Sequence, residues 1–402
     1  MRLSRRSFLT LASAAPGAAV AAGVAPALPD ASSFALEGTY LDAAFIHPYG
    51  RFAVAAAAAY ADTRLHHPKG VGPRINARRA AVERFATLVN ADPKDIAVVP
   101  STLEGENLVN AALGVGLGAG VTTDAGHYDG ALALYAELAR RGTPVEVVRP
   151  VGGRIDLTAL DKQITAETRL VAVSLVSSST GFTYDLAELC ALAHRKGALV
   201  YVDVIQAAGA MPIDVKASGV DFACCGLYKW LMGDFGAAFL YVRPDRLDRL
   251  KRPEVGWRQI KSQESHVLPL ETPGPALGPF TLGSDAASIF EVSTPAWGAL
   301  AVAVASLDHV LGLGVETIAA HRRPLVERLR HALPPKDFIP LTPEGGHGPL
   351  VCFAVKDAKA RYAARLEAAG VTVSVYDQRL RISPSVYNTA EDIDRLVGVL
   401  TG

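Results

Sequence analysis

The middle of the chain alternates short, wholly apolar runs with longer segments whose apolar positions recur at helical spacing. Short apolar strands divided by amphipathic helices are typical of a mainly parallel sheet covered by helices on both faces. The pattern therefore predicts an α/β fold. Helices are expected over residues 103–113, 131–140 and 186–196. Strands are expected over residues 95–99, 121–123, 144–149, 170–176, 198–202, 221–225 and 236–242.

The last third of the chain has a different pattern, with long helical segments expected over residues 299–313 and 321–333. Strands near residues 349–355, 371–376 and 380–383 then mix with helices near 358–369 and 390–400. This mixture predicts a smaller α+β domain. We expect an N-terminal arm over residues 28–60, a large domain over 61–295 and a small C-terminal domain over 296–402.

Residues 1–27 are typical of an export signal rather than of a folded domain. A basic start and a long Ala/Gly/Val stretch precede the small-residue sequence Ala25-Pro26-Ala27. Residues 4–9, Ser-Arg-Arg-Ser-Phe-Leu, resemble the twin-arginine signal. That resemblance implies passage through the twin-arginine export machinery to the periplasm or beyond, already folded, with no stable membrane insertion after cleavage. The alternative is an uncleaved membrane anchor, but Gly17 and Gly23 interrupt the ~20 apolar residues that a spanning helix needs.

Composition excludes several classes of protein. The 402 residues carry 40 Lys+Arg against 40 Asp+Glu, and half of them are apolar, which excludes intrinsic disorder. A zero balance without a basic run argues against nucleic-acid binding. The four cysteines form neither a disulfide framework nor a CxxC pair, so we expect no zinc or other metal site.

Polar residues follow several of the apolar runs directly. Because ligands of open α/β sheets bind at the carboxyl ends of the strands, these residues are expected to converge at one edge. They are Ser101, Thr102, His127, Ser178, Asp203, Gln206 and Lys229.

Asp203 and Lys229 are the residues of this group that are best suited to catalysis or to cofactor binding. A carboxylate at the end of an apolar strand is poorly solvated and needs a cationic partner. A lysine between two apolar strands has its neutral amine favoured, which makes it a candidate Schiff-base nucleophile. Each also has an ordinary structural explanation: Asp203 as a helix N-cap, Lys229 as a side chain whose amine reaches solvent, or the two as a buried ion pair.

The block from Asp203 through Gln206 and Gly209 to Lys229, and on through residues 236–242, resembles the class V aminotransferase family. The likeness is strongest to the branch of isopenicillin N epimerase, kynureninase and cysteine desulfurase. The resemblance implies a fold-type-I architecture, with a mainly parallel seven-stranded sheet sandwiched by helices and a smaller C-terminal domain. It also implies pyridoxal 5'-phosphate as the cofactor.

The resemblance assigns roles to individual residues. Lys229 would form the internal aldimine and, once freed by the substrate amine, move the α-proton. Asp203 would pair with the pyridinium nitrogen and Gln206 with the phenolic oxygen of the ring. His127 would stack on that ring, with Tyr128 as the substitute. Tyr228 and Ser178 would complete the cofactor site.

Three further motifs fit the same family. Ser101 and Thr102 match its phosphate turn, and a helix N-terminus favours a dianion. Thr294, in residues 290–295, matches a threonine that reaches the cofactor phosphate of a second subunit, which implies a homodimer. Arg381, in residues 380–384, matches the arginine that binds the substrate α-carboxylate through its planar fork.

Several positions depart from the cysteine desulfurase pattern. Gly226 and Ser178 stand where those enzymes carry a phosphate-binding serine and an asparagine, while Gly126 and Asp234 replace a common glutamate and a common proline. Desulfurases also need a nucleophilic cysteine on a mobile loop. Here Cys352 lies in an apolar run and is expected in the core, as are Cys190, Cys224 and Cys225.

We therefore expect a pyridoxal-phosphate enzyme that acts on an amino acid or an amino-acid derivative. The pathway would run through an external aldimine and α-proton abstraction, with an aminotransferase-like or epimerase-like outcome. A carbon–carbon or carbon–sulfur lyase is the alternative. A non-catalytic binding protein that keeps the fold is the alternative from another class.

Overall fold

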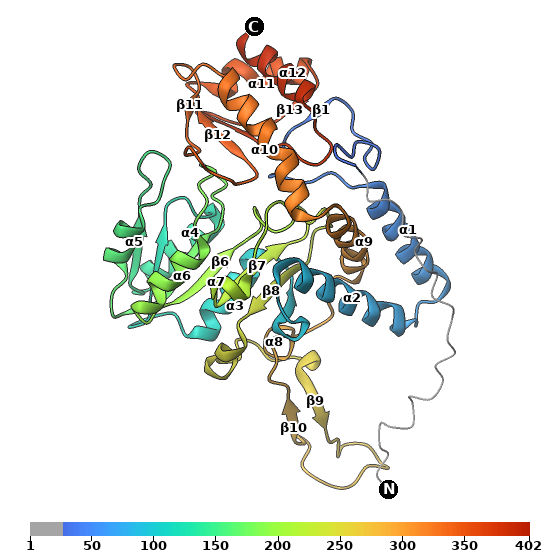
Figure 1. Cartoon of the computed structure of the whole chain (residues 1–402). Coiled ribbons are helices and arrows are strands. Elements are labelled where there is room, and N and C mark those ends of the chain that lie inside the picture. Colours follow the sequence, from blue (N-terminus) through green and yellow to red (C-terminus); the bar gives the residue numbers. More distant parts are fainter. Residues whose placement is uncertain (1–26) are drawn as a thin grey trace.

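The computed structural model describes residues 27–402, without the side chains of residues 71–75. The signal expected over residues 1–27 therefore lies outside the described residues, apart from Ala27. The described chain forms a large sheet-based body, a smaller C-terminal layer and an N-terminal arm that joins the two (Figure 1).

A seven-stranded sheet, ordered β2-β8-β7-β6-β5-β3-β4, forms the centre of the molecule (Figure 1). Only β8 runs antiparallel to its neighbours. Most residues of the seven-stranded sheet are buried on both of its faces, which explains why most of the strands are continuous apolar runs in the sequence. The expected mainly parallel sheet is confirmed. Its strands are β2 (Ile96–Val99), β3 (Gly120–Asp124), β4 (Val145–Val148), β5 (Thr168–Ser174), β6 (Leu199–Asp203), β7 (Phe222–Gly226) and β8 (Ala238–Val242).

Two apolar clusters cover the two faces of this sheet, because successive strand residues point to opposite sides. Val200 and Val202 pack with α2 (Val71–Val89), α5 (Leu157–Gln163), α6 (Leu186–Arg195) and α9 (Trp297–Leu313). Tyr201 packs on the other face with α3 (Thr102–Leu113), α4 (Asp129–Arg140) and α8 (Ala286–Phe290). The sheet is thus sandwiched by helices, and the carboxyl ends of its parallel strands share one edge.

The C-terminal layer is built on a four-stranded antiparallel sheet, ordered β11-β12-β15-β14. Its buried face packs on α10, α11 and α12 through a separate apolar cluster. The run expected as one strand over residues 371–376 forms two, because β13 pairs with β1 of the arm while β14 pairs with β15. The elements are α10 (Val315–Ala332), β11 (Ile339–Pro340), β12 (Val351–Ala354), α11 (Ala358–Ala368), β13 (Val371–Thr372), β14 (Ser374–Tyr376), β15 (Arg379–Ile382) and α12 (Ala390–Thr401).

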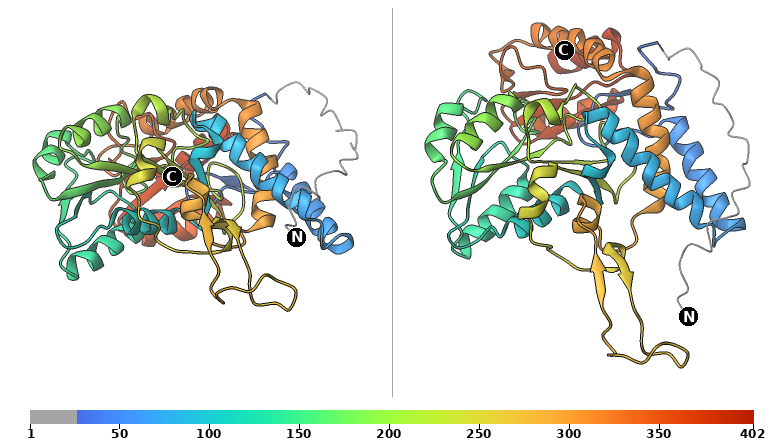
Figure 2. Two further views of the ribbon diagram at one scale, coloured as in Figure 1. Left: turned by 90° about the horizontal axis from the view of Figure 1, so that it is seen from below. Right: turned by 60° about the horizontal axis from the view of Figure 1, so that its bottom comes forward.

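The remaining elements lie at the periphery. A hairpin of β9 (Ile260–Gln263) and β10 (Phe280–Leu282) projects from the body in every view (Figures 1 and 2). Within residues 27–402 no single helix is long and apolar enough to cross a membrane. Only α9 and α10 together reach that criterion, and they meet at a bend of 72°. The others are β1 (Thr39–Tyr40), α1 (Arg51–His66), α7 (Val215–Ser218) and the 3₁₀ turns Pro93–Asp95, Pro244–Arg249 and Trp257–Gln259.

Candidate active site

A cavity of about 450 Å³ lies where the carboxyl edge of the large sheet meets the arm and the C-terminal sheet. The arm contributes its residues 44–46, and the C-terminal sheet contributes β14 and β15. Segments far apart in the sequence therefore line one cavity. This agrees with the prediction that polar residues after the apolar runs converge at one edge of the sheet. Of the predicted site residues, the cavity wall contains Ser101, Ser178, Tyr228, Lys229 and Arg381. It also contains Tyr128, the alternative to His127, whereas His127 itself is not among the lining residues.

Lys229 lies in the turn after β7, with its Nζ 5.7 Å from the ring centroid of Tyr228. Tyr228 in turn stacks on Phe235, with ring centroids 4.8 Å apart. Burial lowers the pKa of Lys229 to about 8, and the charge of Asp203 offsets only part of that effect. On the order of a tenth of the amine is therefore neutral, and nucleophilic, at about pH 7.

Asp203 ends β6 and is almost fully buried. Its Oδ1 accepts a hydrogen bond of 2.8 Å from the backbone N–H of Ile205. Burial raises its pKa to about 6, although this hydrogen bond and the charges of His127 and Lys229 act in the opposite direction. The carboxylate thus lies in a desolvated place that a cationic ring nitrogen would stabilise.

Gln206 has both ends of its amide engaged with the protein. Its Nε2 donates to the carbonyl of Ala44 at 2.9 Å, and its Oε1 accepts from the indole of Trp230 at 3.0 Å. The side chain joins the arm to the segment after Lys229. The second hydrogen of the amide nitrogen is what Gln206 can offer to a phenolic oxygen, so that role stays a prediction.

His127 is the centre of a buried polar network that the sequence did not reveal. Its Nε2 lies 3.0 Å from Oε1 of Glu106, and its Nδ1 lies 2.8 Å from Oγ of Ser174. Glu106 also accepts from the hydroxyl of Tyr135. Burial alone would lower the pKa of His127, but the Glu106 carboxylate outweighs it and raises that pKa. The two contacts hold the imidazole in a fixed orientation, and the carboxylate favours its charged form.

The N-terminus of α3 opens into the cavity at Ser101. The Ser101 hydroxyl caps the helix by accepting from the N–H of Glu104 at 3.1 Å. Thr102 Oγ1 accepts from the N–H of Gly226 at 2.9 Å. A Cβ at Gly226 would lie 3.1 Å from Thr102 Oγ1, so β7 and α3 approach each other closely here. This arrangement leaves a cradle of hydroxyls and helix N–H groups that suits a phosphate dianion.

Arg381 lies on β15, almost fully buried. Its Nη2 donates to Ser374 Oγ at 2.8 Å and lies 3.4 Å from Oδ1 of Asp42 on the arm. Its Nε is buried and has no hydrogen-bond partner among the described residues. Burial raises the pKa of Asp42 to about 6, although Arg381 lowers it in part. Because Arg381 also lines the cavity, part of its guanidinium can meet an incoming carboxylate.

Thr294 lies outside this cavity. It is exposed on the wall of a neighbouring hollow of about 430 Å³, together with Glu104 and Pro295. All four cysteines are buried, and none lines the cavity around Lys229. Cys352 faces Ser178 from β12, and burial raises the pKa of its thiol to about 12, which disfavours the reactive thiolate.

The sequence profile described as aminotransferase class-V matches residues 72–396. The chain belongs to the class V aminotransferase family. The uncharacterized aminotransferase YcbU of Bacillus subtilis is 28% identical over 336 residues, which cover 83% of this chain and 86% of that relative. A cysteine desulfurase of Klebsiella pneumoniae is 30% identical over 346 residues, which cover 81% and 82% of the two chains.

Solved structures show the same fold. The cystine C–S lyase C-DES, in complex with cysteine persulfide, superposes with a TM-score of 0.79 at 23% identity, covering 90% of this chain and 97% of that one. A mutant of C-DES holds glycine covalently linked to its pyridoxal-phosphate cofactor. The fold-type-I architecture expected from the sequence is confirmed, and the cofactor of this class V aminotransferase family member is pyridoxal 5'-phosphate.

The residues present suit this cofactor. The phosphate cradle at Ser101, the buried carboxylate of Asp203 and the amine of Lys229 all belong to the edge where the parallel strands end. Ser101 would thus bind the phosphate, Asp203 the ring nitrogen and Lys229 the aldehyde, each from a different element. The individual assignments remain predictions, but the donor set matches the chemistry of the group.

Proposed function

We propose that this protein is a pyridoxal-phosphate enzyme that removes the α-proton of an amino acid, with an aminotransferase-like or epimerase-like outcome. When bound, the cofactor supplies an electron-withdrawing ring that stabilises negative charge at the substrate α-carbon. The observation that carries the proposal is the amine of Lys229 in the cavity wall, with a pKa lowered to about 8. A base needs a pKa near the working pH.

The other residues would bind and orient. The guanidinium of Arg381 in the cavity wall would meet the α-carboxylate, and the negative charge of Asp203 would hold a proton on the ring nitrogen. His127, fixed by Glu106 and Ser174, would cover one face of the ring. Together these groups position the α-hydrogen for Lys229 Nζ, which accepts it and can return it.

A lyase outcome is the second candidate. It is favoured by the similarity to cysteine desulfurases and to a cystine C–S lyase. Persulfide formation on a protein cysteine is disfavoured, because all four thiols are buried away from the cavity. A lyase here would have to expel the side chain of its substrate without a protein thiol. A binding protein without chemistry is also disfavoured, because the chain has the substrate-binding candidate Arg381 in addition to Asp203, Gln206 and Lys229.

A substrate screen tests the proposal. Free amino acids, small peptides and sulfur-containing amino acids are added singly to the holoenzyme, and the visible absorbance of the cofactor is followed. Mass spectrometry and chiral chromatography then identify the product as a keto acid, an enantiomer or a cleavage fragment. The proposal requires a spectral change with the unmodified enzyme and a product that Lys229→Ala no longer forms. If the cofactor binds and no amino acid perturbs its spectrum, the non-catalytic alternative holds.

Export and dimerisation are further parts of the proposal. The sequence of residues 4–9 supports passage through the twin-arginine machinery, and Arg5→Lys with Arg6→Lys should then trap the protein in the cytoplasm. The exposed position of Thr294 outside its own cavity supports a homodimer in which it serves the partner's site. Unchanged export of the double variant, or a monomer by light scattering, would contradict these parts.

A further inference from the structure

The hairpin of β14 and β15 brings a second arginine to the cavity. Only Asp377 and Gln378 separate the two strands, so the hairpin is tight. Residues two apart on a strand share a face. Arg379 and Arg381 therefore point to the same side, and both line the cavity, while Leu380 between them is fully buried in the core on the other side.

Arg379 has no anionic partner among the described residues. Its guanidinium lies 4.1 Å from the ring centroid of Tyr376, directly across the hairpin. Its Nε is buried without a hydrogen-bond partner in the described chain. Arg328 on α10, by contrast, forms a bidentate contact with Asp394. A planar fork held over an aromatic ring with its Nε unpaired is preorganised for a carboxylate.

The charge of the cavity wall also favours an anionic ligand at Arg379. Its charged residues are Lys229, Arg379 and Arg381 against the single carboxylate of Asp129. The cofactor phosphate belongs at the N-terminus of α3 near Ser101 rather than at the two arginines. Arg381 already contacts Asp42 of the arm, whereas Arg379 has no carboxylate partner among the described residues. An anionic group on the substrate side chain would neutralise the charge of Arg379.

We propose that Arg379 is a specificity residue that binds a second carboxylate, so that the substrate is an amino acid with an acidic side chain. This inference rests on the proposed function of the cavity. The Cα atoms of the two arginines are separated by about 7 Å along the strand. That separation suits the two ends of a dicarboxylic amino acid. Arg381 would take the α-carboxylate and Arg379 the distal one.

Binding of unreactive acids tests this inference without chemistry on the cofactor. Succinate, glutarate and adipate are titrated into the holoenzyme by calorimetry, with butyrate and valerate as single-carboxylate probes. None of them has an amine, so none can react with the cofactor. We expect at least one dicarboxylate to bind about tenfold tighter than the monocarboxylates, since a charged hydrogen-bonded pair is involved. Arg379→Gln should remove this preference and leave monocarboxylate binding unchanged.

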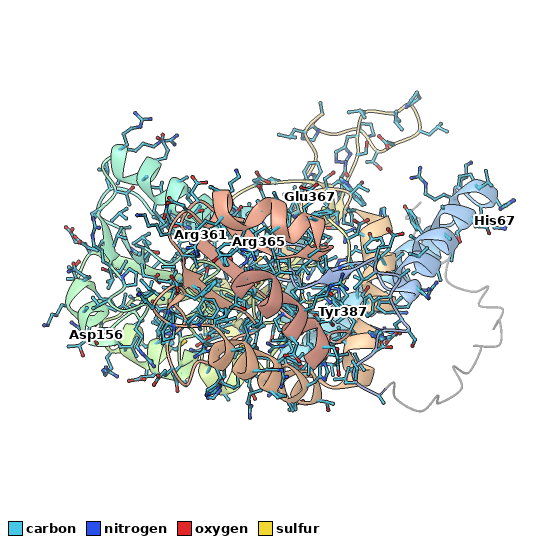
Figure 3. All side chains as sticks on the ribbon, turned by 90° about the horizontal axis from the view of Figure 1, so that it is seen from above. His67, Asp156, Arg361, Arg365, Glu367 and Tyr387 are labelled. Atoms are coloured by element: carbon cyan, nitrogen blue, oxygen red, sulfur yellow. The ribbon has the colours of Figure 1, made fainter. Side chains whose placement is uncertain are left out.

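The matched control is Arg361→Gln. Arg361 also lies over a tyrosine ring, that of Tyr362 at 4.8 Å, but on the outer helix α11 (Figure 3). This variant should keep the dicarboxylate preference, and Arg379→Lys should keep part of it. Equal binding of both acid classes by the unmodified enzyme would overturn the inference. So would an equal loss of both in Arg379→Gln, because the two arginines would then share one carboxylate. Failure of the substrate screen with a preserved dicarboxylate preference would refute the proposed function alone.

Discussion

Arg381 and Asp42 form an ion pair between the C-terminal sheet and the N-terminal arm, with Nη2 and Oδ1 3.4 Å apart. Ser374 links them, since its hydroxyl contacts both side chains at 2.8 Å. The arginine that is expected to bind the substrate is thus oriented by a residue more than 300 positions earlier in the chain. The arm therefore contributes directly to the carboxylate site.

Arg381→Lys separates charge from geometry at this position. A lysine keeps the positive charge beside Asp42, so we expect the stability to stay within about 1 kcal/mol of the unmodified protein. The planar fork is lost, however, so butyrate binding should weaken by about tenfold. Calorimetry and urea unfolding measure the two effects. The control is Arg365→Lys on α11, which should change neither (Figure 3). Undiminished butyrate binding would show that Arg381 does not hold the carboxylate.

Lys229 should give the apoenzyme a distinctive pH dependence. The neutral amine attacks the cofactor aldehyde, and its fraction rises with pH through the pKa of about 8. The rate of cofactor incorporation should therefore rise up to about pH 8 and then level off. Stopped-flow absorbance measures this rate, and the exposed Lys216→Ala serves as the control. A rate that keeps rising towards the ordinary lysine pKa of 10.5 would refute a desolvated amine.

Asp203→Asn tests the burial of a carboxylate in the cofactor-free protein. The folded-state pKa of Asp203 is raised from 3.8 to about 6, so the folded protein binds more protons than the unfolded chain between these values. Its contribution to stability is therefore present below about pH 4 and is lost as pH rises to about 6. Relative to the unmodified apoprotein, Asp203→Asn should gain on the order of 3 kcal/mol between those pH values.

The cofactor should reverse this difference. Bound to the holoenzyme, the ring nitrogen gives Asp203 a cationic partner, so the asparagine variant should be the less stable one at neutral pH. Urea unfolding compares the unmodified protein with the variant, without and with cofactor, at about pH 4 and about pH 7. This gives four differences in the free energy of unfolding. A pH-independent difference in the apoprotein would mean that Asp203 is not desolvated.

Glu106→Gln tests the network under His127. Without the carboxylate, burial should lower the pKa of His127 instead of allowing it to rise. The folded protein should also lose about 1–3 kcal/mol, because a charged hydrogen bond in the core is weakened. Imidazole NMR titration and urea unfolding measure these changes. Glu104→Gln on the exposed side of the same helix is the matched control and should stay within about 0.5 kcal/mol. An unchanged pKa of His127 would show that Glu106 does not act on this imidazole.

The sheet and the residues after its strands could be predicted from the sequence. Seven apolar runs became seven strands, and Ser101, Ser178 and Lys229 reached one cavity because parallel strands end at one edge. The reason is local: most of these strands are buried on both faces and are continuous apolar runs, and the next polar residue marks where each of them ends.

Contacts between distant segments could not be predicted in this way. Glu106 sits on a helix beside other polar residues and has the pattern of a solvated side chain, yet it pairs with His127 in the core. Asp42 lies on an arm without periodicity, and its partner is set by the docking of β1 on β13. Gln206 was expected to face the cofactor, but its amide also holds Ala44 and Trp230. Each of these depends on tertiary geometry.

The most direct test of the account is exchange of the substrate α-hydrogen in deuterium oxide. Amino acids are incubated with the holoenzyme, and deuterium at the α-carbon is counted by mass spectrometry. We predict exchange of at least one amino acid that disappears in Lys229→Ala and persists in Lys216→Ala. The account would be contradicted by a cofactor-loaded enzyme that exchanges no α-hydrogen, or by exchange that survives the loss of Lys229.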